Sequence, residues 1–199
     1  MEIKAKQQLL VFIRNPVLGK VKTRIAAKTG EQKALEIYEL LLRNTLHTCS
    51  QLTKIKVIVY YSDFIDTKDN WNNDIFEKRL QVGKNLGERM AKAFQDNLIE
   101  AEKVVLIGSD CPYLTSNIIE HTFELLAEND VVFGPASDGG YYLMGMKSFN
   151  SSLFENISWS TSDVLKQSLA QIPELKTAFT LELNDIDTFE DYQQWVKEL

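Results

Sequence analysis

The feature that most constrains this chain is an apolar strand that stops at a carboxylate. Residues 104–107 read Val-Val-Leu-Ile and continue as Gly-Ser-Asp-Cys-Pro, which places Asp110 just beyond the run. A continuous apolar run is typical of a strand covered on both faces inside a parallel sheet. Ligands of open α/β sheets bind beyond the carboxyl ends of such strands, where a carboxylate can hold a hard divalent cation and, through it, a phosphate. The alternative is that Asp110 only caps a turn before Pro112, and the run by itself does not decide between the two.

Segments of strand type and of helix type alternate along the rest of the chain. The other expected strands are residues 8–13, 55–61, 131–133, 141–146 and 178–183. Helical spacing of apolar residues is found in residues 31–49, 86–99, 118–127, 162–172 and 188–199. Residues 14–30 are expected to be a loop, and residues 62–83 a polar surface segment. The alternation predicts an α/β fold, a three-layer α/β/α sandwich with a mainly parallel, Rossmann-like sheet, in a single domain over residues 1–199.

The composition narrows the classes of partner. The formal net charge is −6 and the pI is about 5.1, so nucleic acid and anionic membranes are not expected as main partners. No apolar stretch approaches the roughly 20 residues that span a bilayer, and residues 1–4 do not begin a signal peptide, so we expect a cytoplasmic protein. Cys49 and Cys111 do not indicate a disulfide scaffold. We expect Cys49 to be buried on a helix and Cys111 not to be a catalytic thiol.

A cluster of cations follows the first expected strand. Arg14, Lys20, Lys22 and Arg24 lie within eleven residues of an acidic protein, and Gly19 lets backbone amides approach a ligand. Lys and Arg supply charge for phosphate oxygens, so the segment suits a nucleotide phosphate at the same sheet edge as Asp110. It is not a Walker A loop. The alternative is a basic loop exposed to solvent.

Two glycine-containing segments are weaker candidates. Gly83 and Gly87 lie at the start of an expected helix, where backbone N–H groups either face an anion or only form a turn and a helix cap. Asp138 precedes two glycines in a tight turn. This is either a hairpin turn or a place for a sugar or base, with Asp138 binding hydroxyls or acting as a base.

Alternating acids precede the last expected helix. Asp185 and Asp187 lie on the same side of an extended chain and can complete a metal site with Asp110. Alternatively, Asp187 or Thr188 is the N-cap of the helix, and both interpretations can hold at once.

Several other polar and aromatic residues are expected to be structural. Ser160 or Thr161 is a natural N-cap, and Trp159 is expected to be a core aromatic rather than a platform for a ligand. His47 and His121 lie on expected helices with no acid or Cys at ligand spacing, so both are expected at the surface or in structural roles.

Ordered motifs along essentially the whole chain resemble a known bacterial family. They are FIRNP (12–16), GKVKTR (19–24), LGERM (86–90), GSDCP (108–112), GP with DGGYY (134–135, 138–142) and DIDT (185–188). The chain resembles the DUF2064 family, whose members are often described as GT-A glycosyltransferases and include some assigned to arsenosugar biosynthesis. That family is similar to the nucleotide-diphospho-sugar transferase superfamily, and also to phospholactate guanylyltransferases and molybdenum-cofactor nucleotidyltransferases.

The resemblance implies roles for particular residues. In those relatives a Lys-[Ser/Thr]-Arg segment in the first loop holds the nucleotide phosphates, and residues 22–24 match it. An Asp before a Cys-Pro or Thr-Pro pair binds Mg²⁺, which Asp110 matches, and a late acid completes the metal site in the region of Asp185 and Asp187. Phe189 stands where many relatives carry Pro, which should alter only the start of the helix.

Residues and resemblance together predict transfer of a sugar from a nucleoside diphosphate sugar to a small acceptor, with Mg²⁺ or Mn²⁺ held by Asp110 and by Asp185 or Asp187. Asp110 and Asp138 are the expected catalytic residues. The expected nucleotide-binding residues are Arg14, Gly19, Lys20, Lys22, Arg24, Gly83, Gly87 and Arg89. The alternative is a nucleotidyltransferase that joins a nucleoside triphosphate to a phosphorylated small molecule and releases pyrophosphate. A third class is a binding protein without catalysis. The acceptor is expected to be small, or its pocket to be shared across a homodimer interface.

Overall fold

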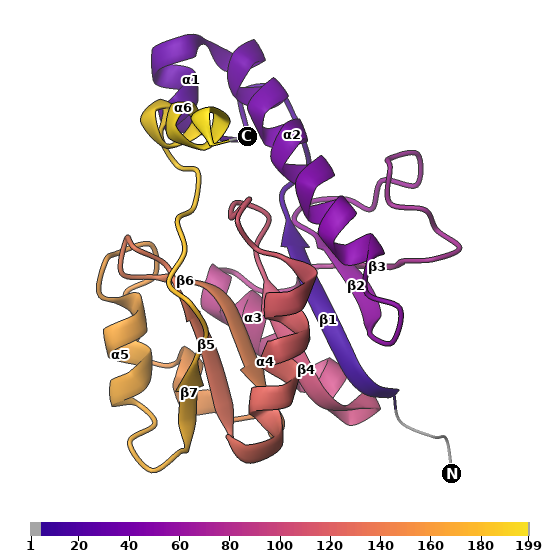
Figure 1. Ribbon diagram of the computed structural model, residues 1–199, viewed down its shortest axis with the longest axis vertical. Coiled ribbons are helices and arrows are strands. Elements are labelled where there is room, and N and C mark those ends of the chain that lie inside the picture. Colours follow the sequence, from indigo (N-terminus) through magenta and orange to yellow (C-terminus); the bar gives the residue numbers. More distant parts are fainter. Residues whose placement is uncertain (1–4, 199) are drawn as a thin grey trace.

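A computed structural model describes residues 5–198 as a seven-stranded sheet with helices on both faces (Figure 1). The strands are β1 (Ala5–Ile13), β2 (Lys56–Tyr61), β3 (Glu77–Leu80), β4 (Ala101–Ile107), β5 (Val131–Pro135), β6 (Tyr141–Met146) and β7 (Thr177–Phe179). The helices are α1 (Thr23–Thr29), α2 (Glu31–Ser50), α3 (Leu86–Glu100), α4 (Ser116–Glu128), α5 (Val164–Ala170) and α6 (Phe189–Lys197), with a 3₁₀ turn η1 (Ser151–Phe154). The expectation about a signal peptide at residues 1–4, and residue 199 of the last expected helix, lie outside the described residues.

The order of the strands places a topological switch point at the centre of the sheet. The order is β3-β2-β1-β4-β6-β5-β7, and β6 runs antiparallel to β4 and β5 while the remaining pairs are parallel. The chain leaves β1 toward β2 and β3, and then returns to add β4 on the other side of β1. The carboxyl ends of β1 and β4 therefore flank the topological switch point, where α/β sheets bind ligands. The expected fold class is confirmed.

Alternate residues of the central strands face opposite layers, as the two-residue period of a strand requires. Leu9 and Val11 of β1 pack in one cluster with residues of α2 and α4, whereas Leu10 and Phe12 pack in another with residues of α3. Residues 104–107 of β4 are all buried, as expected for a strand covered on both faces.

A third apolar cluster lies beyond the sheet, where α1 and α6 meet the beginning of α2 (Figure 1). Ile25 of α1, Ile37 of α2 and Trp195 of α6 are buried in it. Ile186, in the segment that leads into α6, is buried in the same cluster. The cluster therefore joins the chain after β7 to the chain after β1.

The loop expected at residues 14–30 contains the helix α1, so this expectation is wrong in part. Lys22 is the N-cap, with φ 46°, and the helix has seven residues with Ile25 fully buried. So short a helix is not stable by its own hydrogen bonds. Its packing against the third cluster holds it in place, and the local sequence pattern does not show that packing.

Residues 62–83 are not only a polar surface segment, which corrects a second expectation. They include β3, which pairs in parallel with β2 at the edge of the sheet. They also include Trp71 and Phe76, which are buried with their rings edge to face and their centroids 5.0 Å apart. The polar sequence of β3 predicts no strand, so its pairing with β2 decides its conformation.

The predicted N-cap of α5 is wrong. The helix begins at Val164 rather than near residue 162, and its N-cap is Asp163 without a side-chain capping bond. Thr161 donates its hydroxyl hydrogen to the carbonyl oxygen of Ser158 at 2.7 Å, and Ser160 has φ 65°. This segment is therefore a tight turn before the helix.

Other boundaries shift near the end of the chain. β7 ends at Phe179, although the segment after it still bridges to β5 between Leu183 and Ala136. In α6, Trp195 is buried, whereas Val196 is 44% exposed. Cys49 is buried, and His47 and His121 are exposed, as expected.

In the described part of the chain no helix is long and apolar enough to cross a membrane.

Candidate functional site

Lys22 lies at the switch point and is held by oxygen atoms from two other segments. Its Nζ lies 2.7 Å from Asp110 Oδ1 and 3.6 Å from Asp187 Oδ1, and it donates a 2.6 Å hydrogen bond to the carbonyl oxygen of Ile186. The side chain of Lys22 is only 6% exposed, whereas that of Asp110 is 43% exposed. A buried ammonium needs such partners. The structure therefore joins the cationic segment after β1 to the acids after β4 and β7.

Backbone hydrogen bonds fix the segment of Asp185 and Asp187 to the end of β4. The amide of Ile186 donates to the carbonyl oxygen of Asp110 at 2.9 Å, and the Ile186 side chain is buried. Further back, the amide of Leu183 donates to the carbonyl oxygen of Pro135 at 3.1 Å. Asp185 and Asp187 are therefore placed by both the central strand and β5.

Thr188, not Asp187, caps the last helix. The Thr188 hydroxyl accepts from the amide of Asp191 at 3.2 Å, and Asp191 Oδ2 accepts from the amide of Thr188 at 2.7 Å, which makes a capping box. The carboxylate of Asp187 instead pairs with Lys22 and, at 3.2 Å, with Arg24. Of the two interpretations of this segment, capping belongs to Thr188, and Asp187 faces the cations.

A cavity of about 220 Å³ opens beside these acids. Its lining residues are Ser137, Asp138, Asn184, Asp185, Asp187 and Asp191. Asp138 Oδ1 accepts from the amide of Gly140 at 2.9 Å, which shapes the turn between β5 and β6. Gly139 has φ 90°, and a Cβ there would lie 2.0 Å from the carbonyl oxygen of Ser162. The turn therefore needs glycine at that position to bring Asp138 to the cavity.

The electrostatics of the cavity are unfavourable for an ionised Asp185. Burial, followed by the carboxylates of Asp110, Asp138 and Asp187, raises the pKa of Asp185 to about 7, while Lys22 acts in the opposite direction. Among the described residues, Asp185 Oδ1 is a buried atom without a hydrogen-bond partner. A buried oxygen without a partner costs free energy, and a ligand at this position would remove that cost.

Burial, with Asp185 as the next cause, raises the pKa of the Cys111 thiol far above its usual range. The thiol is therefore neutral at physiological pH and a poor nucleophile. This agrees with the expectation that Cys111 is not catalytic.

Residues that sequence reasoning missed hold the rim of the switch point in place. The Tyr38 hydroxyl accepts from the amide of Arg14 at 2.8 Å and donates to the carbonyl oxygen of Arg14 at 3.0 Å, and it lies 3.3 Å from Ser109 Oγ. Asn15 is buried and bonds to the segment after β2 through Ser62 and Phe64. Asn15 follows the expected site residue Arg14, whereas Tyr38 lies in an expected helix, and only their partners, distant in sequence, reveal the role.

The other predicted phosphate ligands lie at the same edge of the sheet. Arg14 and Lys20 are exposed in the loop after β1, and Lys20 closes a turn there by donating its amide to the carbonyl oxygen of Val17 at 3.0 Å. Gly19 lies in this turn, and Arg24 is 72% exposed at the start of α1. The structure thus brings Lys22 and Arg24 to the acids, and leaves Arg14 and Lys20 facing solvent.

The segment before α3 is ordered by contacts within the protein. Arg89 Nε donates to the carbonyl oxygen of Gly83 at 3.1 Å. A Cβ on Gly87 would lie 2.4 Å from Trp159 Nε1, so the indole packs directly on the first turn of α3. Trp159 is half-buried against the cluster of α3, in agreement with the prediction of a structural aromatic. The contact with Trp159 explains the glycine at residue 87 without a ligand. Gly83, Gly87 and Arg89 remain predicted nucleotide contacts.

The acids of the cavity provide donors that suit a hard divalent cation. Mg²⁺ and Mn²⁺ take carboxylate oxygens, and Asp110 and Asp185 each have a buried Oδ1 without a well-aligned hydrogen bond. The 2.7 Å contact between Asp110 Oδ1 and Lys22 is thus an ion pair of poor hydrogen-bond geometry. Over residues 5–198, however, no three His, Cys, Asp or Glu side chains are grouped so that they could hold an ion. Asp110 and Asp187 converge on Lys22 instead.

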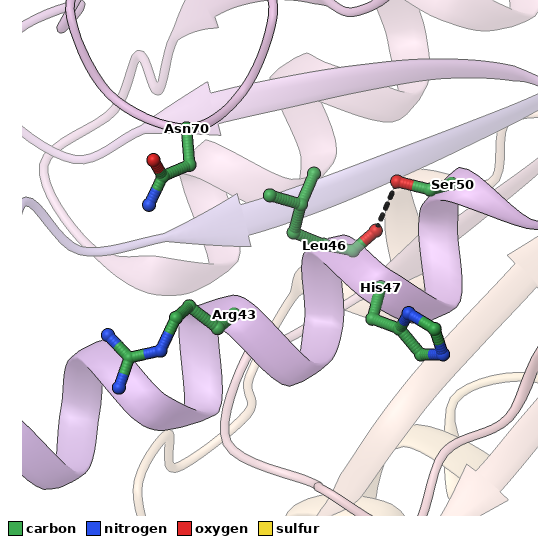
Figure 2. Close-up of a pocket in the computed structure, with 5 residues that line it drawn as sticks. All are labelled: Arg43, Leu46, His47, Ser50 and Asn70. Atoms are coloured by element: carbon green, nitrogen blue, oxygen red, sulfur yellow. Dashed lines mark hydrogen bonds between the residues drawn. The ribbon is translucent and has the colours of Figure 1, made fainter.

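A larger hollow of about 520 Å³ lies along α2 and has a different character. Figure 2 shows that its side chains point in different directions rather than toward one point. Ser50 donates its hydroxyl hydrogen to the carbonyl oxygen of Leu46 at 2.7 Å, and His47 Nε2 lies 3.0 Å from Gln51 Nε2. Ser50 and His47 thus have partners within or directly after their own helix, and the side chains of this hollow do not converge, so the acidic cavity is the candidate site.

Solved structures share this fold. A proposed nucleotide-diphospho-sugar transferase from Desulfovibrio desulfuricans G20 is 28% identical, with a TM-score of 0.88 over 96% of this chain and 87% of that chain. CMP:2-keto-3-deoxy-manno-octonic acid synthetase in complex with CTP is 10% identical, with a TM-score of 0.62 over 98% and 100% of the two chains. Rv0371c from Mycobacterium tuberculosis H37Rv, in complex with manganese, is 13% identical, with a TM-score of 0.56 over 98% and 100%. The fold is therefore that of the nucleotide-diphospho-sugar transferase class.

The family follows from the sequence match. Residues 45–161, more than half of the chain, match the model of DUF2064, described as an uncharacterized protein conserved in bacteria. The protein belongs to this family, as the ordered motifs indicated. A search of curated proteins finds no match.

Proposed function

We propose that this protein is a metal-dependent transferase that moves a sugar from a nucleoside diphosphate sugar to a small acceptor, with residues 1–199 acting as one domain. The observation that carries the proposal is the convergence of Lys22, Asp110 and the segment of Asp185 and Asp187 at the switch point, beside an acidic cavity. The 28% identical structure of a proposed nucleotide-diphospho-sugar transferase supports it.

On the donor side, cations of the segment after β1 bind the phosphates. Lys22 and Arg24 are already at the switch point, and Arg14 and Lys20 extend the positive charge toward solvent. Because these residues share one short segment, they can contact both phosphates of a diphosphate. Gly19, Gly83, Gly87 and Arg89 complete the nucleotide side of the proposed site.

The acids hold the metal ion in this proposal. Asp110 and one of Asp185 and Asp187 are the ligands, because their oxygens are hard donors beside the phosphate-binding segment. A bound Mg²⁺ or Mn²⁺ supplies the charge that stabilises the leaving diphosphate. Since the pKa of Asp185 is about 7, its carboxylate becomes a better ligand as pH rises through neutrality.

On the acceptor side, Asp138 is the proposed base. The bond between the anomeric carbon and the phosphate oxygen breaks, the acceptor oxygen bonds to that carbon, and Asp138 takes the proton of the acceptor hydroxyl. The cavity of about 220 Å³ is smaller than the pockets of about 300–1,000 Å³ that hold drug-sized ligands, so the acceptor is small.

Nucleotidyl transfer is the second candidate, and the fold shared with the CTP-bound synthetase favours it. The same cations and metal ligands would serve a nucleoside triphosphate. Four of the six residues that line the cavity, however, are aspartates, which repel a phosphorylated acceptor. The charge of the cavity therefore supports an acceptor that offers a hydroxyl group, and with it sugar transfer.

Thermal unfolding with separate ligands tests the proposal. The wild-type protein is mixed with nucleoside triphosphates, nucleoside diphosphates and sugar nucleotides, each with and without Mn²⁺ or Mg²⁺. A ligand at about 100 times its Kd stabilises the protein by about 2.7 kcal/mol. We expect a metal-dependent shift with one sugar nucleotide. A shift confined to triphosphates would favour nucleotidyl transfer, and no shift with any ligand would contradict the nucleotide site.

Matched variants separate the metal site from general effects on stability. Asp110→Asn should lose the metal-dependent part of the shift, because it removes a proposed ligand. Asp96→Asn on α3, whose side chain is 41% exposed and pairs with Lys92, changes the charge equally and should keep the shift. An unaltered metal dependence in Asp110→Asn would exclude the proposed metal site.

A further inference from the structure

We propose that Lys22 takes the place of the divalent cation in the free protein, so that metal and donor phosphates bind together and not one after the other. The inference rests on the proposed function, and it states what controls metal binding at the site. The ammonium of Lys22 must leave the carboxylates before the carboxylates can hold a metal.

The contacts of Lys22 are those of a small cation among oxygens. Asp110 Oδ1 lies at 2.7 Å, the carbonyl oxygen of Ile186 at 2.6 Å and Asp187 Oδ1 at 3.6 Å. These oxygens come from two chain segments that are far apart in the sequence. A group with one positive charge thus occupies the position where the proposed metal ligands converge.

The charge around Lys22 makes exchange for a divalent cation favourable. Asp110 and Asp187 both lie against the ammonium of Lys22, and Asp187 lines one cavity together with Asp138 and Asp185. Arg24, which also pairs with Asp187, is 72% exposed and contributes less because solvent screens it. Asp185 Oδ1 has no hydrogen-bond partner among the described residues while Lys22 is in place. The single positive charge of the Lys22 ammonium therefore neutralises only part of the negative charge of these carboxylates.

The structure also indicates which part of Lys22 can move. Its neighbours Val21 and Ile25 are both buried, so the backbone at the N-cap of α1 is anchored. The side chain is long and flexible. Because residues 14–24 are the proposed phosphate-binding segment, the ammonium can turn from the carboxylates to an incoming diphosphate. The phosphates then attract Lys22, and the vacated carboxylates attract the metal.

Direct measurement of Mn²⁺ binding tests this exchange. Free Mn²⁺ is followed by electron paramagnetic resonance during titration of the protein with MnCl₂, without nucleotide. The wild-type protein should bind Mn²⁺ weakly, whereas Lys22→Met should bind it at least about tenfold more tightly, because a competing buried charge is gone. Lys22→Arg keeps the charge and should stay weak.

Two controls make the result specific. Lys28→Met removes the same charge from the same helix at a surface pair with Glu190, and it should bind Mn²⁺ as the wild type does. Asp110→Asn combined with Lys22→Met should lose the gain. If Lys22→Met does not fold, as circular dichroism would show, the wild type is titrated in the presence of UDP, CDP or GDP, and one of them should tighten Mn²⁺ binding at least about tenfold.

The outcomes separate this inference from the proposed function. Equal and tight Mn²⁺ binding by the wild type and Lys22→Met would overturn the exchange and leave the metal site standing. No binding by either protein, even with nucleotide, would overturn both the exchange and the metal-dependent function. Tight binding only after removal of Lys22, or only with a diphosphate, supports the exchange.

Discussion

The carboxyl of Asp185 couples the charge of the site to the stability of the fold. Its Oδ1 is buried, and burial together with the neighbouring acids raises its pKa from 3.8 to about 7. Below pH 3.8 the group is protonated in both the folded and the unfolded protein. Between pH 3.8 and about 7 the folded protein holds a proton that the unfolded chain has released, so this group lowers stability as pH rises. Above pH 7 the full cost of the buried carboxylate is present.

Replacing Asp185 with Asn should therefore stabilise the protein in a pH-dependent way. At pH 8, without metal, we expect a gain of about 2 kcal/mol, which allows for partial exposure of the side chain. The gain should shrink at pH 5, where the folded wild type is protonated at this group. Urea denaturation at the two pH values measures the difference.

The same substitution at the surface residue Asp96 provides the control, and its effect on the free energy of unfolding should not show this trend. A gain for Asp185→Asn that is equal at pH 5 and pH 8 would contradict the raised pKa.

At the scale of elements, two close approaches of backbone and side chain order the site. The indole of Trp159 packs against Gly87 in the first turn of α3, and Gly139 in the turn of Asp138 packs against Ser162. Trp159 and Ser162 belong to the short segment that leads into α5. This segment therefore connects the predicted nucleotide side of the site with the proposed acceptor side.

Gly87→Ala tests the first of these approaches. In a helix, glycine to alanine ordinarily stabilises by about 1 kcal/mol. Here a Cβ would lie 2.4 Å from Trp159 Nε1, and the half-buried ring cannot easily move away. We expect a loss of about 1–3 kcal/mol in the free energy of unfolding, because the added methyl group overpacks this contact.

Two further variants check the cause of that loss. A Cβ on Gly108 would meet no atom within 4 Å, so Gly108→Ala should change stability much less. In the background of Trp159→Ala, the cost of Gly87→Ala should largely disappear, which a double-mutant cycle would show. A stabilising Gly87→Ala would mean that the indole does not lie on this turn.

At the scale of the whole molecule, the site lies between apolar clusters of different size. The two large apolar clusters cover the two faces of the sheet, whereas the third is a small cluster among α1, α2 and α6 (Figure 1). Lys22 is at the start of α1, and Asp187 is two residues before α6. Two charged residues of the proposed site, Lys22 and Asp187, are thus attached to the smaller cluster.

We therefore expect α1 and α6 to open more readily than the centre of the sheet. Hydrogen–deuterium exchange of the free protein should be fast in α1 and α6 and slow in β1 and β4, because local stability follows buried apolar contact. Ligand binding at the switch point should slow exchange in α1 and α6. Protection of α6 as strong as that of β4 in the free protein would contradict this picture.

The sequence by itself determined the parts of this protein whose signal is local and periodic. The apolar run of β4 predicts a strand covered on both faces, and the period of α2 and α3 predicts helices, because burial of one strand or helix face imposes these repeats. The position of Asp110 after a central strand, and of the cations after the first strand, indicates one edge of the sheet for both. The ordered motifs indicated the family, which the match over residues 45–161 confirms.

Only the tertiary structure decided the features that depend on contacts between distant segments. The helix α1 and the strand β3 form where their sequences are polar or short, because partners elsewhere in the chain pack against them. The ion pairs of Lys22 with Asp110 and Asp187 join residues 88 and 165 positions apart, and no local pattern specifies them. A lysine in a loop is equally suited to solvent, phosphate or carboxylate; the fold selects the carboxylates here, because it withdraws Lys22 from water at the point where the acids meet.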